Sequence, residues 1–323
     1  MGQTLTAAAL DANFTVARAN LQIHAEQARG AFASNTERAL KADVVIFLAW
    51  CRMADVVPMP AAPETVSLFI DAMGEQKATA TVRRYVSSIA SFHRAAGMAN
   101  PTEAMAVKLA LKRLHRAKGR AQLQAGPLNR PLVERMLASV PKTLAGLRNR
   151  ALVAVAYDTL ARRSELVALQ VEDIQAGEHG AGSILIRRSK VDQEGIGEIR
   201  YLAPDTMRHL RAWLAGAEVM SGSIFRGVAK GGRVAEGLST AAVAELFKKM
   251  AMAAGATLDK AGRISGHSSR VGAAQDMARH GLKLPAIMQA GGWKTATMVA
   301  RYTARLDARR SGAAKLAVLQ DRG

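Results

Sequence analysis

Helical periodicity broken by prolines and glycines runs through the first 117 residues and restricts them to an all-helical fold. Residues 36–56 space their apolar side chains as one face of a helix requires, with Ser34 or Asn35 as the expected N-cap. Prolines at 58, 60 and 63 end that helix, and Pro63 fits the first turn of a second one over 63–74. Further helices are predicted over 79–97, which ends at a glycine, and over 101–117. We therefore predict an N-terminal helical bundle.

The second part of the chain is also mainly helical, with one exception. Three short apolar segments separated by glycine-containing turns, at 169–174, 183–190 and 197–202, predict a small antiparallel sheet. Helices are expected around this sheet, over 130–139, 145–158, 204–216, 239–254, 267–280, 285–290, 296–305 and 311–320. The predicted fold class is mainly α with one small β-sheet.

The predicted helices suggest two domains joined by a linker. The N-terminal domain would cover residues 1–117, of which residues 1–20 could be disordered. Residues 118–129 contain glycines and a proline and are expected to form the linker, and 130–323 would form the C-terminal domain. A chain of 323 residues is long enough for each domain to have its own core.

The charge balance indicates a polyanionic partner. The chain has 45 Lys and Arg against 26 Asp and Glu, a formal net charge of +19. Such a basic protein is expected to meet nucleic acid or an anionic membrane. No apolar run reaches the ~18 residues of a membrane span, and the N-terminus does not resemble a signal peptide. The single cysteine, Cys51, fits a reducing compartment, so we expect a cytoplasmic protein.

Basic residues gather in and around the predicted linker. No acidic residue occurs between Glu103 and Glu134, and a basic linker between two basic domains suits a clamp around a duplex. The helices at 79–97 and 239–254 are candidates for the major groove. Candidate DNA-contact residues are Lys77, Arg83, Arg84, Tyr85, Arg116, Lys118, Arg120, Lys248 and Lys249.

Four short motifs carry residues that could act on a phosphodiester. Tyr302 stands between arginines in VARYTAR, although a helical tyrosine is more often a core residue. His267 and Arg270 are spaced i, i+3, which places both on one face at the first turn of a helix, where anions bind. Lys190 lies at the tip between two predicted strands, where lysines are ordinarily solvated.

The fourth motif is RRSELVAL, read as the interior of a helix. Arg162 begins it near an apolar face, and Glu165 at i+3 could be its partner in an internal ion pair. Read alone, this motif leaves a structural and a catalytic role equally open.

Taken together, the motifs resemble the tyrosine recombinase (phage integrase) family. The resemblance is tight over residues 150–175 and 265–306, carried by DTLARRSEL, GHSSRVGAAQDMAR and LPAIMQAGGW, and looser over most of the chain. It implies a core-binding, SAM-like helical domain and a catalytic domain that form a C-shaped clamp around DNA. It also implies a DNA-associated protein encoded by a bacterium, phage or plasmid. One departure is Arg163, because an apolar residue is usual after the catalytic arginine.

The resemblance also implies a role for each motif. It implies Tyr302 as nucleophile, Arg162 and Arg270 as phosphate-binding arginines, Lys190 as general acid, His267 as the histidine of His-x-x-Arg, Trp293 in the place of a second histidine, and Glu165 in support.

The implied activity is site-specific recombination through a 3′-phosphotyrosyl intermediate and a Holliday junction. The reaction is expected to need neither metal nor ATP, and no cofactor is predicted. Expected partners are duplex DNA with inverted repeats and further copies of the chain, a dimer per site and a tetramer in synapsis, joined through an exchange helix at 311–320. Two alternatives stay open: a type IB topoisomerase-like enzyme that relaxes DNA, and a DNA-binding protein with a decayed site.

Overall fold

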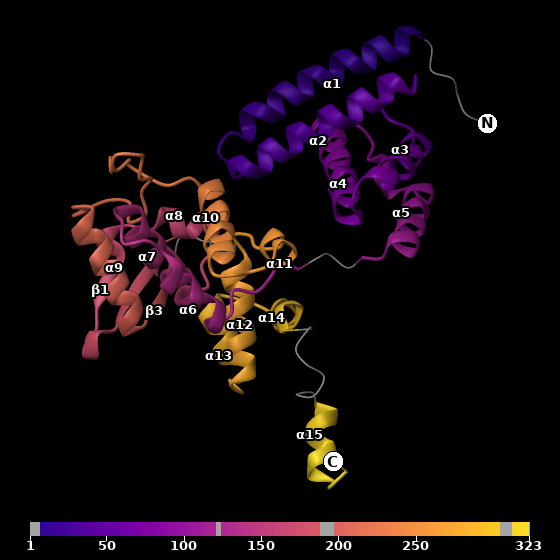
Figure 1. Ribbon diagram of the computed structural model, residues 1–323. Coiled ribbons are helices and arrows are strands. Elements are labelled where there is room, and N and C mark those ends of the chain that lie inside the picture. The colour runs from indigo at the N-terminus through magenta and orange to yellow at the C-terminus, as the bar shows by residue number, and fades with distance from the viewer. Residues whose placement is uncertain (1–6, 121–123, 188–196, 304–311, 323) are drawn as a thin grey trace. The chain divides into compact units, whose positions relative to one another are not determined.

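The computed structural model describes residues 7–120, 124–187, 197–303 and 312–322 and divides into two compact units, 1–123 and 124–323 (Figure 1). The division falls inside the segment expected to be the linker. No helix in these described ranges is long and apolar enough to cross a membrane.

Unit 1 is a bundle of helices. Its elements are α1 (Ala7–Gln27), α2 (Ser34–Met53), α3 (Pro63–Gln76), α4 (Thr79–Ala95), the 3-10 turn η1 (Pro101–Glu103) and α5 (Met105–Lys118). Its core packs Phe47, Phe69 and Tyr85 among aliphatic side chains, with the Phe47 and Phe69 rings edge to face at 5.1 Å. Within the first 20 residues, for which disorder was expected, α1 begins at Ala7, and it buries Ala17.

Unit 2 combines helices with one three-stranded antiparallel sheet in the order β1-β2-β3. The strands are β1 (Ile174–Ala176), β2 (Gly182–Ile186) and β3 (Glu198–Leu202), and Ile184 faces Arg200 across β2 and β3. The helices are α6 (Arg130–Ser139), α7 (Leu144–Thr159), α8 (Arg163–Ala168), α9 (Pro204–Gly216), α10 (Thr240–Ala253), α11 (Leu258–Gly262), α12 (Ser268–Arg279), α13 (Leu284–Gly291), α14 (Ala296–Thr303) and α15 (Gly312–Leu319), with 3-10 turns η2 (Val171–Asp173) and η3 (Glu178–Gly180).

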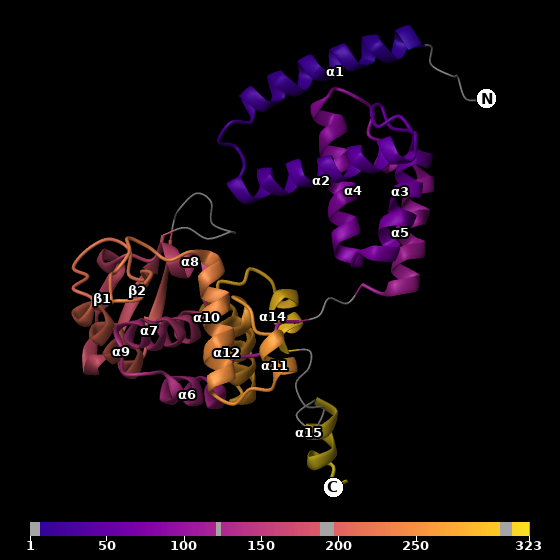
Figure 2. The same cartoon turned by 45° about the horizontal axis from the view of Figure 1, so that its top comes forward.

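Helix α7 is the central element of unit 2. Residues 151–156 are all buried, so this helix is apolar around most of its circumference. It contacts α9 and β3 as well as α12, and it lies in the middle of the unit (Figure 2). The end of α7 and the start of α12 are thereby held next to each other, which is where two of the chemical motifs lie.

Two details of the predicted elements are wrong, one in the sheet and one at the start of α8. Residues 169–174 are not a strand, because 171–173 form η2 and β1 begins only at Ile174. Arg162 does not lie inside a helix: α7 ends at Thr159, its C-cap Leu160 adopts the left-handed conformation with φ 50°, and Arg162 is the N-cap of α8. The left-handed residue turns the chain, so α8 starts as a separate short helix.

Candidate active site

Arg162 and Glu165 form the first wall of the site. The backbone N–H of Arg162 donates to Glu165 Oε2 at 2.7 Å, and its Nη1 donates to Oε1 at 2.5 Å. Glu165 is buried, whereas the Arg162 side chain is 15% exposed and Arg163 is exposed. The N-cap position therefore directs Arg162 inward, and its buried carboxylate partner fixes its orientation.

Arg270, in the first turn of α12, forms the floor of the site. It is only 2% exposed, and its Nη1 donates to the carbonyl of Leu160 while Nη2 donates to that of Gly291 at 2.9 Å. Burial, and then the charge of Arg162, lower the pKa of this guanidinium below its ordinary value. Its Nε is buried without a hydrogen-bond partner among the described residues. One donor of the buried cation is thus left over for a ligand.

Trp293 follows the turn that ends α13. Gly292 has φ 60°, and the next residue, Trp293, is 3% exposed and packs in the small core beneath the site. The Arg270 guanidinium lies 4.9 Å from the centre of its ring. Within the described residues the indole Nε1 is buried and has no acceptor. A second buried donor next to Arg270 is therefore unsatisfied.

Tyr302, on α14, closes the site. Its ring lies 5.1 Å from that of Trp293, tilted by 35°, and 6.3 Å from that of His267. The side chain is partly buried, and its side-chain hydrogen bond with Arg270 raises the pKa of that guanidinium. Six of the seven predicted catalytic residues are thus joined by contacts in two groups: Tyr302 with Trp293, Arg270 and His267, and Arg162 with Glu165.

His267 is the N-cap of α12 and remains exposed. Its pKa is lowered from the ordinary value first by desolvation and then by the positive charges of Arg270, Arg162 and Arg163. An imidazole near pKa 6.5 is already mostly neutral at pH 7, and this shift makes it more so. A neutral imidazole can accept a proton at this position.

Lys190 lies in the segment 188–196, outside the described residues. The strands on either side of it, β2 and β3, pair over Gly182–Ile186 and Glu198–Leu202. Its role stays a prediction.

Two glutamines hold the end of α14, which carries Tyr302, and were not found by sequence reasoning. Gln275 Nε2 donates to the carbonyl of Tyr302 at 3.0 Å. Gln124 Nε2 donates to the carbonyls of Arg301 at 2.9 Å and Tyr302 at 3.3 Å. The last carbonyls of a helix lack partners within the helix, so these amides cap α14. No sequence signal identifies them, because single polar residues on loops and helices are common.

Most of the predicted DNA-contact residues are exposed, and one of them is buried. Arg83, Arg116, Lys118, Arg120 and Lys249 are exposed, and Lys248 is partly exposed beside Glu245. Tyr85 is wrong as a DNA contact, because it is 4% exposed and packs in the core of unit 1 against Phe69. Arg84 pairs with the buried Asp43 at 3.0 Å, and about half of its side chain stays exposed.

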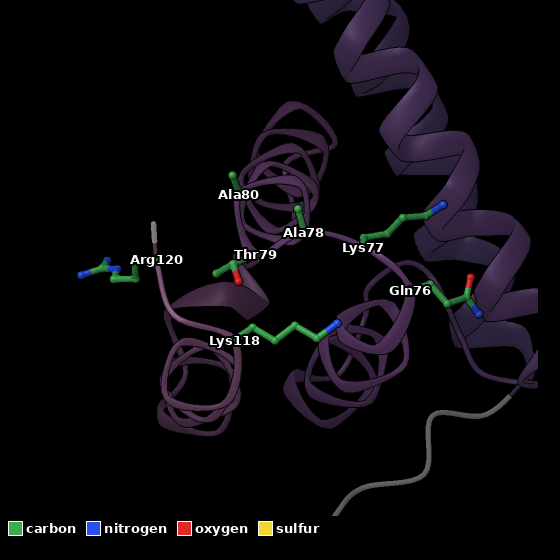
Figure 3. A pocket seen from close by; sticks show the side chains of 7 residues that line it. All are labelled: Gln76, Lys77, Ala78, Thr79, Ala80, Lys118 and Arg120. Carbon is green, nitrogen blue, oxygen red and sulfur yellow. The ribbon is translucent and has the colours of Figure 1, made fainter. Parts of the chain in front are cut away.

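Lys77, Lys118 and Arg120 line an open pocket of about 360 Å³ in unit 1 (Figure 3). Lys118 reaches from the end of α5 and donates to the carbonyl of Glu75 at 3.0 Å, whereas Arg120 points away. The pocket also contains Thr79, where α4 begins. Free N–H groups at a helix start and nearby cations favour a phosphate group.

Comparisons with known proteins agree on one family. The model of the phage integrase family matches residues 128–309. Recombinase cre of Escherichia phage P1 is 31% identical over 324 residues, with 94% of each chain covered. An integrase/recombinase XerD homologue of Selenomonas ruminantium is 35% identical over 285 residues, covering 84% of this chain and 81% of the relative. The resemblance to the tyrosine recombinase (phage integrase) family inferred from the sequence motifs is confirmed.

Solved structures share the fold at low identity. The Tn1549 transposon integrase in complex with a circular intermediate DNA has a TM-score of 0.65 and 15% identity, covering 94% of this chain and 99% of that one. A lambda integrase dimer bound to a core site has a TM-score of 0.61 and 14% identity, covering 90% and 95%. The mainly helical fold with a small sheet is confirmed.

Proposed function

Because the chain belongs to the phage integrase family, we propose that it is a site-specific recombinase that cuts and rejoins two DNA duplexes through a 3′-phosphotyrosyl link. The observation that carries this proposal is the pair of unsatisfied buried donors, Arg270 Nε and Trp293 Nε1, beside the Tyr302 ring in the described part of the site. Leaving buried donors unpaired costs ~1–3 kcal/mol each. A scissile phosphate between them would remove that cost.

The proposed reaction begins with attack of the Tyr302 hydroxyl oxygen on phosphorus. The tyrosine proton passes to neutral His267, consistent with its lowered pKa, and the bond from phosphorus to the 5′-oxygen breaks. Lys190 donates a proton to the departing oxygen, which leaves as a 5′-hydroxyl. A 5′-hydroxyl of the partner duplex then attacks the phosphotyrosyl bond, so the energy of the original bond is kept and ATP is not needed.

The proposed transition state is stabilised by fixed positive charge. Arg162 and Arg270 donate charge-assisted hydrogen bonds to the non-bridging oxygens, and Trp293 adds its indole N–H. Glu165 holds Arg162 in place. Two guanidiniums with preset orientation can supply the charge stabilisation that metal ions supply in other phosphoryl-transfer enzymes, so we propose a reaction without metal.

DNA binding is proposed to rest on both units. The net charge of +19 and the exposed basic side chains around the start of α4 support contacts with phosphates. Each neutralised phosphate releases counterions, so affinity should fall steeply with salt. Further contacts from α10 through Lys248 and Lys249 are proposed for the C-terminal unit.

A homo-oligomer on DNA is proposed to form through α15. None of its described residues is buried, and Leu316, Val318 and Leu319 are 49%, 72% and 82% exposed. Burying such side chains is worth ~1.5–3 kcal/mol each, which favours packing on another surface. We propose a neighbouring protomer as that surface, with a dimer on each inverted-repeat site and a tetramer in synapsis.

The test is to trap covalent adducts on DNA that flanks the gene for this chain and to map the attachment position. Wild-type protein should give an SDS-resistant adduct at inverted repeats, and Tyr302→Phe should give none. Tyr201→Phe is the matched control, since Tyr201 is 63% exposed on β3 and should leave adduct formation intact. Adducts that persist in Tyr302→Phe would refute the nucleophile.

The same preparation separates the alternatives. Relaxation of a plasmid without paired sites would favour the topoisomerase-like function. DNA binding without any adduct from the wild type would favour a decayed site.

A further inference from the structure

Arg200 is a buried arginine beside the site that no step of the proposed reaction uses. It lies on β3 and is 8% exposed. Its Nη1 donates to the carbonyl of Gln289 at 2.7 Å, and Nη2 pairs with Glu198 on the same strand. Burial lowers its pKa below the ordinary value despite the nearby carboxylates of Glu198 and Glu165. A buried cation that binds a backbone carbonyl 89 residues away indicates a specific positional role.

The carbonyl that Arg200 holds belongs to the last turn of α13. Arg270 holds a second carbonyl of the same turn, that of Gly291, at 2.9 Å. The Gln289 carbonyl also accepts from the N–H of Gly292 at 3.2 Å, and each of the two carbonyls gains a donor from a buried guanidinium. The turn before Trp293 is therefore bound by two arginines: Arg200, which lies on β3, and Arg270, which lies on α12.

Gly292 shows how closely this turn fits the Arg200–Glu198 pair. A Cβ atom added at Gly292 would overlap Arg200 Nη2 and Glu198 Oε2, and φ is 60°. Only glycine combines this conformation with this contact at little cost. Trp293, the next residue, places its ring 4.9 Å from Arg270 and 5.1 Å from Tyr302. A shift of the turn would thus move the unsatisfied indole N–H and the ring against which the nucleophile packs.

We propose that Arg200 is a positioning residue that fixes the Gly291–Gly292–Trp293 turn and thereby places Trp293 and Arg270 for the phosphate; this rests on the proposed recombinase function. Arg200 can act through a planar fork that binds Gln289 and Glu198 at once, which the single ammonium of a lysine cannot reproduce. A displacement of ~1 Å at a reacting centre can cost ~100-fold in rate. Arg200 is expected to contribute through geometry and not through direct contact with DNA.

The test uses the full-length protein and a duplex that contains the cleavage position mapped with the wild type. First-order cleavage rates and DNA affinity are measured for Arg200→Lys, Trp293→Phe and the double variant. Arg148→Lys is the matched control, because Arg148 is also buried in unit 2, at 6% exposed, and donates to a backbone carbonyl, that of Arg226, at 3.1 Å. A second substrate carries sulfur as the 5′-bridging atom, whose departure needs no general acid.

Arg200→Lys should cleave ~30-fold or more slowly with DNA affinity within ~3-fold of the wild type. The double variant should be no more than ~3-fold slower than the slower single variant, because both changes disturb the same turn. The defect should persist on the sulfur substrate, and Arg148→Lys should cleave at the wild-type rate.

Four outcomes would overturn the proposal. They are wild-type cleavage by Arg200→Lys, multiplied rate losses in the double variant, rescue by the sulfur substrate, and an equal defect in Arg148→Lys. Rescue would show that Arg200 serves protonation of the leaving oxygen. If thermal melting shows that Arg200→Lys does not fold, Gly292→Ala replaces it, with the same expected defect and the same contrary outcomes. An absence of adducts from the wild type would instead refute the proposed function.

Discussion

Asp276 joins three helices behind the site, and replacing it should destabilise unit 2 by an amount that can be worked out from its contacts. Its Oδ2 accepts from the Tyr157 hydroxyl at 2.7 Å and from the backbone N–H of Arg130 at 2.7 Å. Its Oδ1 pairs with Arg279, whose side chain is 35% exposed, at 3.0 Å. The carboxylate thereby links α12, which carries Arg270, to α7 and α6.

Asp276→Ala should remove both of these partly buried hydrogen bonds. A hydrogen bond to a charged group contributes ~1.5–3 kcal/mol, so two give about 3–6 kcal/mol, with at most ~1 more from the partly exposed ion pair. Asp276→Asn keeps one acceptor oxygen for the Tyr157 and Arg130 donors and turns its amide group toward Arg279. We therefore expect a loss of about 4 kcal/mol for alanine and about 1.5 kcal/mol for asparagine.

Urea unfolding in a Trp50→Phe background measures this directly. Of the three tryptophans, Trp213 and Trp293 then remain, and both belong to unit 2, so fluorescence follows that unit alone. Glu245→Gln serves as reference, because the exposed pair with Lys248 should be worth less than ~0.5 kcal/mol. Equal losses for alanine and asparagine, or a loss below ~1.5 kcal/mol for alanine, would refute the reasoning.

Three further predictions concern single side chains. Gln275→Glu keeps the shape but loses the N–H that caps the Tyr302 carbonyl, so single-turnover cleavage should fall ~10-fold at unchanged DNA affinity; an unchanged rate would contradict this. Burial lowers the pKa of His93, whose Nε2 accepts from the N–H of Ala61, so the unfolded state binds the proton first as pH falls. Stability of unit 1 should be full above pH ~6.5 and decline below it, and the midpoint of melting should depend less on pH in His93→Gln. Burial raises the pKa of Cys51 to about 11, so N-ethylmaleimide at pH 8 should label it only after unfolding, and rapid native labelling would contradict the buried position.

Local sequence patterns were sufficient to predict most of the helices. Pro63, Pro204 and Pro285 each stand in the first turn of a helix, as their fixed φ and missing N–H favour. The apolar spacing of α4 and α10 also predicted helices close to the observed ones. These signals depend only on neighbours within a few residues, so they can be read without the fold.

The residues suited to phosphodiester chemistry were also evident from the sequence, but their positions in the helices and their burial were not. Arg162 was expected inside a helix and instead caps one, because Leu160 ends α7 in the left-handed conformation. Tyr85 was expected to contact DNA on a basic helix, yet its ring faces the core. A helical pattern predicts a periodic face but leaves its boundary residues undecided.

The sequence by itself determined the family, the mainly helical class and the set of side chains suited to phosphodiester chemistry, because short motifs carry that information. Only the tertiary structure decided which further residues hold that set in place. Gln124 meets the carbonyl of Tyr302 across 178 residues, and Arg200 meets that of Gln289 across 89. The carbonyls at a helix end accept any suitably placed donor, so the identity of that donor is decided by how distant segments pack.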